Sequence, residues 1–286
     1  LSLALAAIML VGMMVVSASA ASYNDLTDKD QIVNKDAVSM LVSLGIIEGK
    51  PDGSYGPTEN VDRAQMAKML SVIMNKGVDN SALYQSVNSG LTDITSNWAK
   101  GHINYCYTTG IIAGRGNGTF DPSATVTALE AAKMLLVAVG YDPAIEGFEG
   151  ADWAINVSVR ADEQGIFEGF TKDLSAPLNR DDAALLIYNA LDVEMIQSYT
   201  TNNYPIVYSD HRTILSDKYG VIKVEGVVTA NEWAILDDDT DTALQEGKTR
   251  IYNPDGILST TGNTAVAQDS SANVKTQVFN VSTPVD

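Results

Sequence analysis

Cysteine is almost missing from this chain, because Cys106 is the only one among 286 residues. An intrachain disulfide is therefore excluded, and the fold must depend on packing alone. Cys106 lies between Ile103 and Tyr107 in a segment with helical spacing, which predicts a small buried side chain and not a reactive thiol.

Basic residues are scarce as well. Lys and Arg together number 18 against 36 Asp and Glu, which gives a formal net charge of −18, and no basic run interrupts this excess. A surface of that charge repels nucleic acid and acidic lipid. We therefore expect no nucleic acid among the partners of this chain.

Long apolar runs are absent except at the start. Residues 1–16 are almost all apolar, and small residues follow up to Ala21. This pattern predicts a secretory signal peptide at 1–20, cleaved between Ala20 and Ala21. The run is about 4 residues shorter than a membrane-spanning helix needs, so we expect no membrane span after cleavage. Because Leu1 opens the chain without a basic segment, we expect a fragment that lacks its true start. Export without disulfides suits a bacterial surface protein.

Residues that carry chemistry form no recognisable catalytic pattern. His102 and His211 are the only histidines, and the sequence contains no nucleotide-binding glycine loop, Ser–His–Asp order or zinc spacing. Asp237, Asp239 and Asp241 alternate like the start of a calcium loop, but the glycine and the closing glutamate of such a loop are missing. We predict a solvated acidic turn there, with no metal and no cofactor. A pair of catalytic carboxylates for glycoside hydrolysis remains an alternative, because acidic residues are numerous.

What the chain does contain is an internal repeat. A shift of 65 residues superimposes many residues without a gap: Leu26-Thr27-Asp28 on Leu91-Thr92-Asp93, Gly45-Ile46-Ile47 on Gly110-Ile111-Ile112, and Ala67-Lys68-Met69-Leu70 on Ala132-Lys133-Met134-Leu135. A third copy is weaker: Trp153 matches Trp98, Gly165-Ile166 matches Gly110-Ile111, and Leu178-Asn179-Arg180 matches Val61-Asp62-Arg63. Such self-similarity indicates three units that pack together.

Each copy predicts a helix, a loop and a second helix. The first helix ends at a glycine (Gly45, Gly110 or Gly165), which can adopt a left-handed conformation. A Gly-x-aromatic turn follows in the first two copies, and we expect its aromatic side chain, Tyr55 or Phe120, to pack onto the core. The second helix opens with a capping box in each copy: Asp62-x-x-Gln65, Thr127-x-x-Glu130 and Asn179-x-x-Asp182. Asp182 is short for the return contact.

These residues resemble the S-layer homology (SLH) family. The features that carry the resemblance are the Tyr23-Asn24-Asp25 start, a tryptophan in the first helix (Trp98, Trp153), Gly45-Ile46-Ile47-Glu48-Gly49, the Gly118-Thr119-Phe120-Asp121-Pro122 loop, and the helix starts Asp62-Arg63-Ala64-Gln65 and Thr127-Ala128-Leu129-Glu130. The resemblance covers roughly residues 23–195. It implies a mainly α module of three helix-loop-helix repeats with pseudo-threefold packing, at 23–80, 88–143 and 148–195.

The resemblance also implies a function. SLH repeats attach proteins non-covalently to an anionic, often pyruvylated, secondary cell-wall polysaccharide, through grooves between repeats. Carried over by position, the polysaccharide-binding residues are Arg63, Arg180, Trp98, Trp153, Thr127 and Glu130. Guanidinium groups suit this role because their planar donors pair with a carboxylate. The alternatives are that the arginines are solvated surface residues and that the tryptophans belong to the core.

Departures from the family pattern limit the number of grooves. Ala128 stands where the second repeat should have its arginine, so that groove is either inactive or uses Lys100 or Arg115. Val33 replaces the tryptophan of the first repeat, and the third repeat lacks the Gly-x-aromatic-x-Pro loop. We expect one or two working grooves.

From Tyr204 onward the composition favours strands. Residues 221–228, 249–252 and 278–281 are rich in β-branched residues and predict a small β-rich domain at 204–286, which we expect to continue beyond Asp286. Residues 258–273 read as a linker.

The sequence as a whole favours an exported, non-enzymatic protein of the bacterial cell wall or S-layer. Its expected partners are the polysaccharide and, in a surface layer, other copies of itself. Two alternatives stay open: the anchor end of a larger extracellular enzyme such as a polysaccharide hydrolase, and a structural repeat that binds protein and no sugar.

Overall fold

The computed structural model describes residues 22–221, 227–230, 244, 248–252 and 276–280. The predicted signal peptide at 1–20, the acidic residues Asp237, Asp239 and Asp241, and the linker at 258–273 lie outside these described residues. Contacts divide the chain into two units, one of residues 1–138 and 142–190, the other of residues 139–141 and 191–286.

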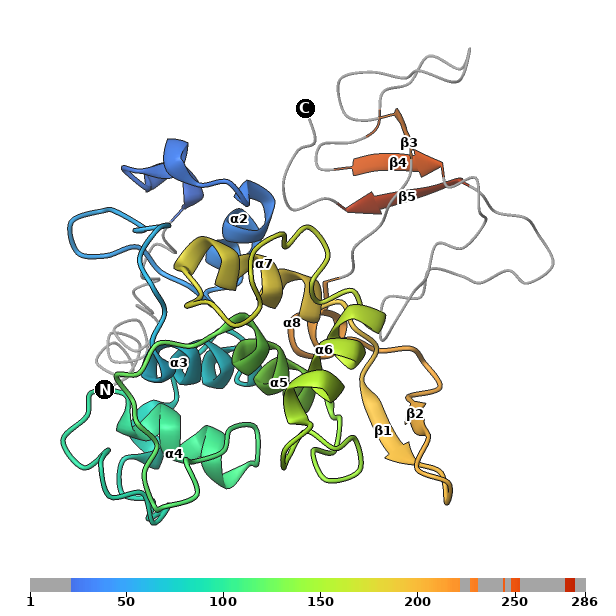
Figure 1. The fold of residues 1–286 in the computed structure, drawn as a ribbon. Helices are drawn as coiled ribbons and strands as arrows, with labels where there is room; N and C mark the ends of the chain where they lie inside the picture. Colours follow the sequence, from blue (N-terminus) through green and yellow to red (C-terminus); the bar gives the residue numbers. More distant parts are fainter. Residues whose placement is uncertain (1–21, 222–226, 231–243, 245–247, 253–275, 281–286) are drawn as a thin grey trace, which may run out of the picture. The chain divides into compact units, whose positions relative to one another are not determined.

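Helices dominate the first unit, and they pack together in one cluster (Figure 1). Three helix pairs follow the three sequence copies: α2 (Lys35–Ser43) and α3 (Arg63–Met74), α4 (Lys100–Thr108) and α5 (Ala128–Val139), and α6 (Trp153–Glu163) and α7 (Arg180–Ala190). Short 3-10 turns precede or separate them: η1 (Tyr23–Asp25), η2 (Lys29–Gln31) and η3 (Ser81–Tyr84). The helix-loop-helix architecture predicted from the sequence is thus confirmed.

A closed circuit of three backbone hydrogen bonds joins the helix pairs. The amide of Val61 donates to the carbonyl of Leu178 (2.8 Å), that of Leu178 to Val126 (2.8 Å), and that of Val126 to Val61 (2.9 Å). All three side chains are at most 2% exposed. Because each copy donates to one neighbour and accepts from the other, the arrangement has pseudo-threefold symmetry.

Helices pack against the neighbouring copy. α3 of the first copy contacts α4 of the second, and α7 of the third contacts α2 of the first. Between the second and third copies, the ammonium of Lys133 on α5 lies 5.7 Å from the ring centroid of Trp153 on α6. On α4, the buried thiol of Cys106 contacts the carbonyl of Ala67 on α3 at 3.4 Å, which confirms its expected structural role. Each apolar helix face is therefore buried only when all three copies are present.

Local sequence signals account for the ends of these helices. Gly45, Gly110 and Gly165 all have φ between 69° and 79°, the left-handed conformation predicted for them. The reciprocal capping boxes form at Asp62 and Thr127. In the third copy the side chain of Asn179 accepts from the amide of Asp182, as expected.

One helix start differs from the expected pattern. Trp153 is the first residue of α6, but Trp98 lies two residues before α4 and so is not in a helix. The Asn97 side chain explains this, because it accepts a hydrogen bond from the amide of Ala99 and stabilises a turn there.

The aromatic residues of the loops are buried, as predicted, since Tyr55 is 1% and Phe120 is 0% exposed. An aspartate of the same copy holds each loop in place. Asp28 accepts from the amides of Tyr55 and Gly56 (2.7 and 2.8 Å), and Asp93 accepts from the amides at 120 and 121 (2.9 and 2.7 Å). The aspartate of the Leu-Thr-Asp motif therefore fixes the loop of its own copy by accepting hydrogen bonds from two backbone amides.

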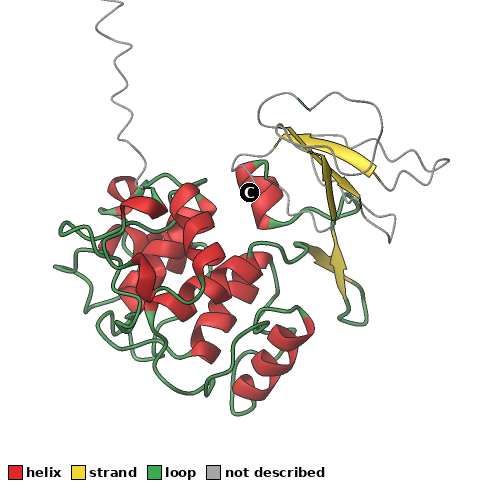
Figure 2. Cartoon of the chain, turned by 90° about the horizontal axis from the view of Figure 1, so that it is seen from above, coloured by secondary structure: helices red, strands yellow, loops and turns green. Residues whose placement is uncertain are grey.

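The second unit contains short strands, drawn in yellow in Figure 2. β1 (Ile196–Tyr199) pairs antiparallel with β2 (Pro205–Val207), helix α8 spans Ile214–Tyr219, and a second sheet has the order β3 (Val227–Ala230), β4 (Lys248–Tyr252), β5 (Thr276–Asn280). The expected β-rich region is thus confirmed, whereas β1, β2 and α8 were not predicted. No helix in the described part of the chain has the length and hydrophobicity needed to cross a membrane.

Candidate functional site

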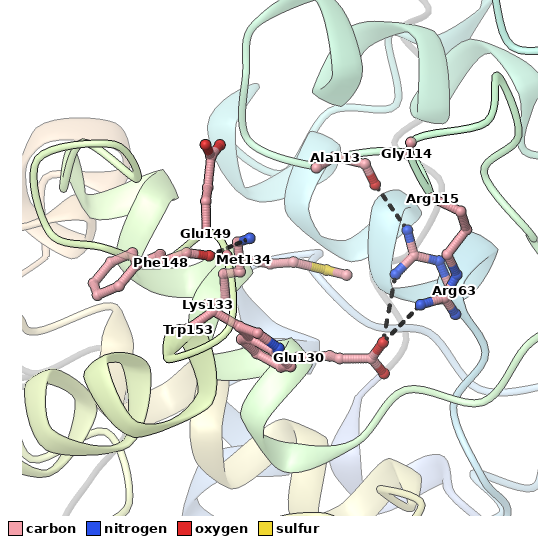
Figure 3. Close-up of a pocket in the computed structure, with 12 residues that line it drawn as sticks. Arg63, Ala113, Gly114, Arg115, Glu130, Lys133, Met134, Phe148, Glu149 and Trp153 are labelled. Atoms are coloured by element: carbon pink, nitrogen blue, oxygen red, sulfur yellow. Dashed lines mark hydrogen bonds and ion pairs between the residues drawn. The ribbon is translucent and has the colours of Figure 1, made fainter.

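A cavity of about 570 Å³ opens where the three copies of the first unit meet (Figure 3). Its walls come from the start of α3, the loop at 113–116, one face of α5 and the segment 148–153. Three of the predicted site residues, Arg63, Glu130 and Trp153, line it together. We call it the Arg63 pocket.

Arg63 holds the loop of the second copy in place. Its Nε donates to the carbonyl of Phe120 and its Nη2 to that of Ala113, both at 2.8 Å, and its guanidinium lies 4.4 Å from the Phe120 ring centroid. Arg63 is only 4% exposed, so the interpretation of this arginine as a solvated surface residue is wrong. Burial lowers its pKa to about 10, which leaves it charged at neutral pH. The remaining Nη1 lies 3.9 Å from Glu130.

Glu130 connects the cap of α5 to the charges of the pocket. Its Oε2 accepts from the amide of Thr127 (3.1 Å), whose hydroxyl accepts from the Glu130 amide (3.2 Å). Its Oε1 accepts from Nη1 of Arg115 at 3.0 Å. Figure 3 shows this carboxylate joined by dashed lines to both guanidinium groups. Thr127 thus shapes the helix start, and Glu130 orients both arginines.

The opposite wall combines a cation with an aromatic ring. Lys133 donates from Nζ to the carbonyl of Phe148 at 2.6 Å and lies 5.7 Å from the Trp153 ring centroid. Burial lowers the pKa of Lys133, whereas Glu149 raises it. The pocket therefore holds three cationic side chains and two carboxylates, from Arg63, Arg115, Lys133, Glu130 and Glu149. Its net charge is opposite to that of the chain.

Arg180 and Trp98 are the counterparts of Arg63 and Trp153 in the aligned repeats. Arg180 repeats the Arg63 contacts: its Nε donates to the carbonyl of Tyr55 (2.8 Å), its Nη2 to that of Glu48 (3.3 Å), and its guanidinium lies 4.7 Å from the Tyr55 ring centroid. Lys68, the counterpart of Lys133, lies 3.4 Å from the Glu48 carboxylate. By alignment of the repeats, Arg180, Lys68 and Trp98 correspond to Arg63, Lys133 and Trp153, and we call this set of three residues the Arg180 groove.

Trp98 is 57% exposed, and its ring packs edge-on against His102 at 6.3 Å. The alternative that this tryptophan belongs to the core is therefore wrong. Its exposure leaves an aromatic surface available to a ligand.

Sequence reasoning misplaced one residue of the Arg63 pocket and missed another. Arg115 was one of two side chains, with Lys100, considered for the groove of Ala128 if that groove is active, but it pairs with Glu130 beside Arg63 because its loop lies over the start of α3. Lys133 was not identified, although a signal existed: the 65-residue shift retains a lysine within an otherwise apolar tetrapeptide.

A serine–histidine–aspartate line lies elsewhere in the unit. Nδ1 of His102 is 2.6 Å from Oγ of Ser71, and its Nε2 is 3.6 Å from Asp79. Ser71 and His102 are 4% and 3% exposed, and the serine hydroxyl also bonds to the Lys68 carbonyl. This arrangement joins α3 to α4 and offers a substrate no access. Among the described residues, no group of His, Cys, Asp and Glu could hold a metal ion.

Comparison with known proteins agrees with this geometry. Residues 22–67 and 90–132 match the S-layer homology domain. A cell surface protein of Thermoanaerobacter kivui is 28% identical over 234 residues, which are 81% of this chain and 28% of that protein. An S-layer protein of Bacillus licheniformis is 33% identical over 113 residues, 40% of this chain and 12% of that protein.

Part of this chain is also similar to an enzyme. An amylopullulanase of Thermoanaerobacterium thermosulfurigenes is 30% identical over 186 residues, 60% of this chain and 10% of that protein. The chain spans less than a third of the length of each of these relatives. Two segments of this chain, residues 22–67 and 90–132, are thus similar to the S-layer homology domain.

Proposed function

We propose that this chain anchors an exported protein non-covalently to an anionic secondary cell-wall polysaccharide, as a structural protein of the S-layer or envelope. The observation that carries the proposal is the Arg63 pocket, a cationic cavity in a chain with a net charge of −18. S-layer and cell surface proteins among the relatives support the same location. In this proposal residues 148–195 act as the third repeat, and the place of Leu178 in the hydrogen-bonded circuit supports this.

The pocket offers two kinds of contact to an acid sugar. A carboxylate such as that of a pyruvyl group pairs with Nη1 of Arg63, with Arg115 and with Lys133, and each charge-assisted hydrogen bond contributes about 1.5–3 kcal/mol. The Trp153 ring packs against the apolar face of the sugar. Phe120 and Ala113 already fix the Arg63 guanidinium, so little side-chain entropy is lost on binding.

The test is sedimentation of the protein with sacculi of the bacterium that produces it. Arg63→Ala also removes two structural hydrogen bonds, so Lys133→Gln is the sharper variant in the pocket and Lys68→Gln in the Arg180 groove. We expect each to weaken binding about tenfold. Lys76→Gln, at an exposed lysine beyond the end of α3, is the matched control and should bind normally. Undiminished binding by the Lys68→Gln, Lys133→Gln double variant would remove these sites from the mechanism.

Removal of the acidic groups from the polysaccharide separates this proposal from a repeat that binds only protein. If sugar acids are the ligand, the protein should no longer sediment with the treated sacculi. Retention on the treated sacculi would favour a protein partner.

A second candidate function is the anchor end of a larger extracellular enzyme. The similarity to the amylopullulanase favours it, because the shared segment is only 10% of that protein. Both candidates use the same polysaccharide-binding module. Reading the gene beyond Asp286 distinguishes them, since a catalytic domain there would support the enzyme.

A further inference from the structure

The hydrogen-bonded circuit allows the three copies to be compared position by position. Each site combines one side chain from each copy. One copy supplies an arginine at the start of its second helix, and the next copy supplies a lysine from within its own second helix. The remaining copy supplies a tryptophan just before or at the start of its first helix. In the Arg63 pocket these are Arg63, Lys133 and Trp153; in the Arg180 groove they are Arg180, Lys68 and Trp98. The third set is Ala128, Leu185 and Val33. We call this last place the Ala128 joint.

All three ligand-type side chains are therefore replaced by apolar ones at the same joint. Ala128 is fully buried, and Val33 is 82% exposed. Leu185 points towards the loop of its own copy, since a Cβ atom placed on Gly169 would lie 3.7 Å from Leu185 Cδ2. Scattered degeneration of the repeats would have affected different joints, whereas here the losses coincide.

The Ala128 joint has instead a set of hydrogen bonds between the third copy and the first. The Asp181 carboxylate, on α7, accepts hydrogen bonds from the backbone amides of Val33 and Asn34 at 3.2 Å and from the Asn34 side chain at 3.2 Å. Asp181 is 5% exposed. These contacts tie the third copy to the first across 147 residues of chain.

The other two joints lack this polar pair. The counterparts of Asp181 are Ala64 and Leu129, and those of Asn34 are Ala99 and Ala154. An apolar pair thus occurs at two joints and a hydrogen-bonded polar pair at the third. Both partners differ together, which indicates a contact specific to this joint.

The charge at the Ala128 joint also opposes an acidic ligand. Asp181 and Asp182 are adjacent and both less than 10% exposed. Lys172 forms an ion pair with Asp182, and although burial raises the pKa of Asp181, the same lysine lowers it, so one lysine faces two carboxylates here. An anion brought to this place would meet like charge where the other two sites present an arginine and a lysine.

We propose that the Ala128 joint is a closure contact and not a polysaccharide groove, so that one chain binds two acid sugars, in the Arg63 pocket and the Arg180 groove, while Asp181 and Asn34 lock the ring of repeats. This inference rests on the proposed function for the two sites.

Isothermal titration of the full chain with a pyruvylated hexosamine glycoside tests the number of sites. We expect two sites per chain, with Lys133→Gln and Lys68→Gln each removing one. Three sites, or a single site, would overturn the inference and leave the proposed function standing. No binding at all would overturn the proposed function and with it the count of sites.

A separate measurement, the melting temperature, tests whether Asp181 holds the third copy to the first. Asp181→Ala should lower the melting temperature by about 5 °C and keep two sites, because several hydrogen bonds are lost while the side chains of the Arg63 pocket and the Arg180 groove are unchanged. Leu129→Ala, at the corresponding position of the second copy, is the control for loss of packing without loss of a polar contact. An unchanged melting temperature for Asp181→Ala, or a new third binding site in the folded variant, would contradict the proposed closure contact between Asp181 and Asn34.

Discussion

The hydroxyl of Tyr55 donates a 2.7 Å hydrogen bond to the carbonyl oxygen of Arg180, although 125 residues separate them in the chain. The guanidinium of the same arginine covers the tyrosine ring and donates to the tyrosine carbonyl. Two residues of different copies thus hold each other through three distinct contacts. Neither helix propensity nor local spacing requires this relationship.

Tyr55→Phe should lower the free energy of unfolding by about 1 kcal/mol, because one partly buried hydrogen bond is lost and the ring is kept. Phe120 occupies the equivalent position in the second copy without a hydroxyl, so the fold tolerates the change. Urea denaturation followed by fluorescence measures the effect. A loss above about 3 kcal/mol would mean that the hydroxyl has a further role.

Arg63→Ala should destabilise the first unit by about 3 kcal/mol, since it removes two hydrogen bonds to buried carbonyls and uncovers the Phe120 ring. Arg180→Ala should cost less, because Arg180 is more exposed and its contact with the Glu48 carbonyl is longer at 3.3 Å. Parallel urea titrations compare the two variants. Equal losses would contradict the view that burial distinguishes the two arginines.

Stability should fall as the pH drops below about 6.5, because of His102. Burial lowers the pKa of His102 below its ordinary value of 6.5, although Asp79 raises it and Lys68 lowers it further. Below pH 6.5 the unfolded state therefore binds a proton that the folded state rejects, and this contribution to stability is complete only above that pH. Melting temperatures between pH 5 and pH 8 should slope less in His102→Gln. An identical slope in both proteins would assign the pH dependence to other groups.

Asp93 should produce a second loss of stability in stronger acid. Burial raises its pKa, but hydrogen bonds from the amides of Phe120 and Asp121 outweigh burial and hold the pKa below the ordinary 3.8. Its contribution is therefore present above pH 3.8 and is lost as the pH falls through the folded-state pKa. Asp93→Asn should be less stable at pH 6 and change less between pH 4 and pH 2. Urea midpoints across this range provide the check.

The repeated framework could be predicted from the sequence because its signals are local. A glycine that ends a helix, a capping box and an aromatic residue after a turn each act within a few residues. Gly110, Thr127 and Phe120 therefore adopt the conformation or burial that their neighbours indicate. The fold class followed from three copies of this pattern.

The site was predicted less completely because its contacts are long-range. Arginine is usually exposed, yet Arg63 is buried because carbonyls 50 and 57 residues away converge on its guanidinium. Only the pseudo-threefold packing places those carbonyls. Strand β1 and helix α8 were missed for a different reason: each is too short for periodicity to identify it.

The hydrogen-bonded circuit of Val61, Val126 and Leu178 fixes the number of repeats. A solenoid can grow by adding units and needs special terminal units to cover its two ends. In a closed trio every donor already has its acceptor, so no end surface remains on which a fourth unit could stack. Evolution can then vary such a module only by changing the three joints individually, as the contrast between Arg180 and Ala128 illustrates.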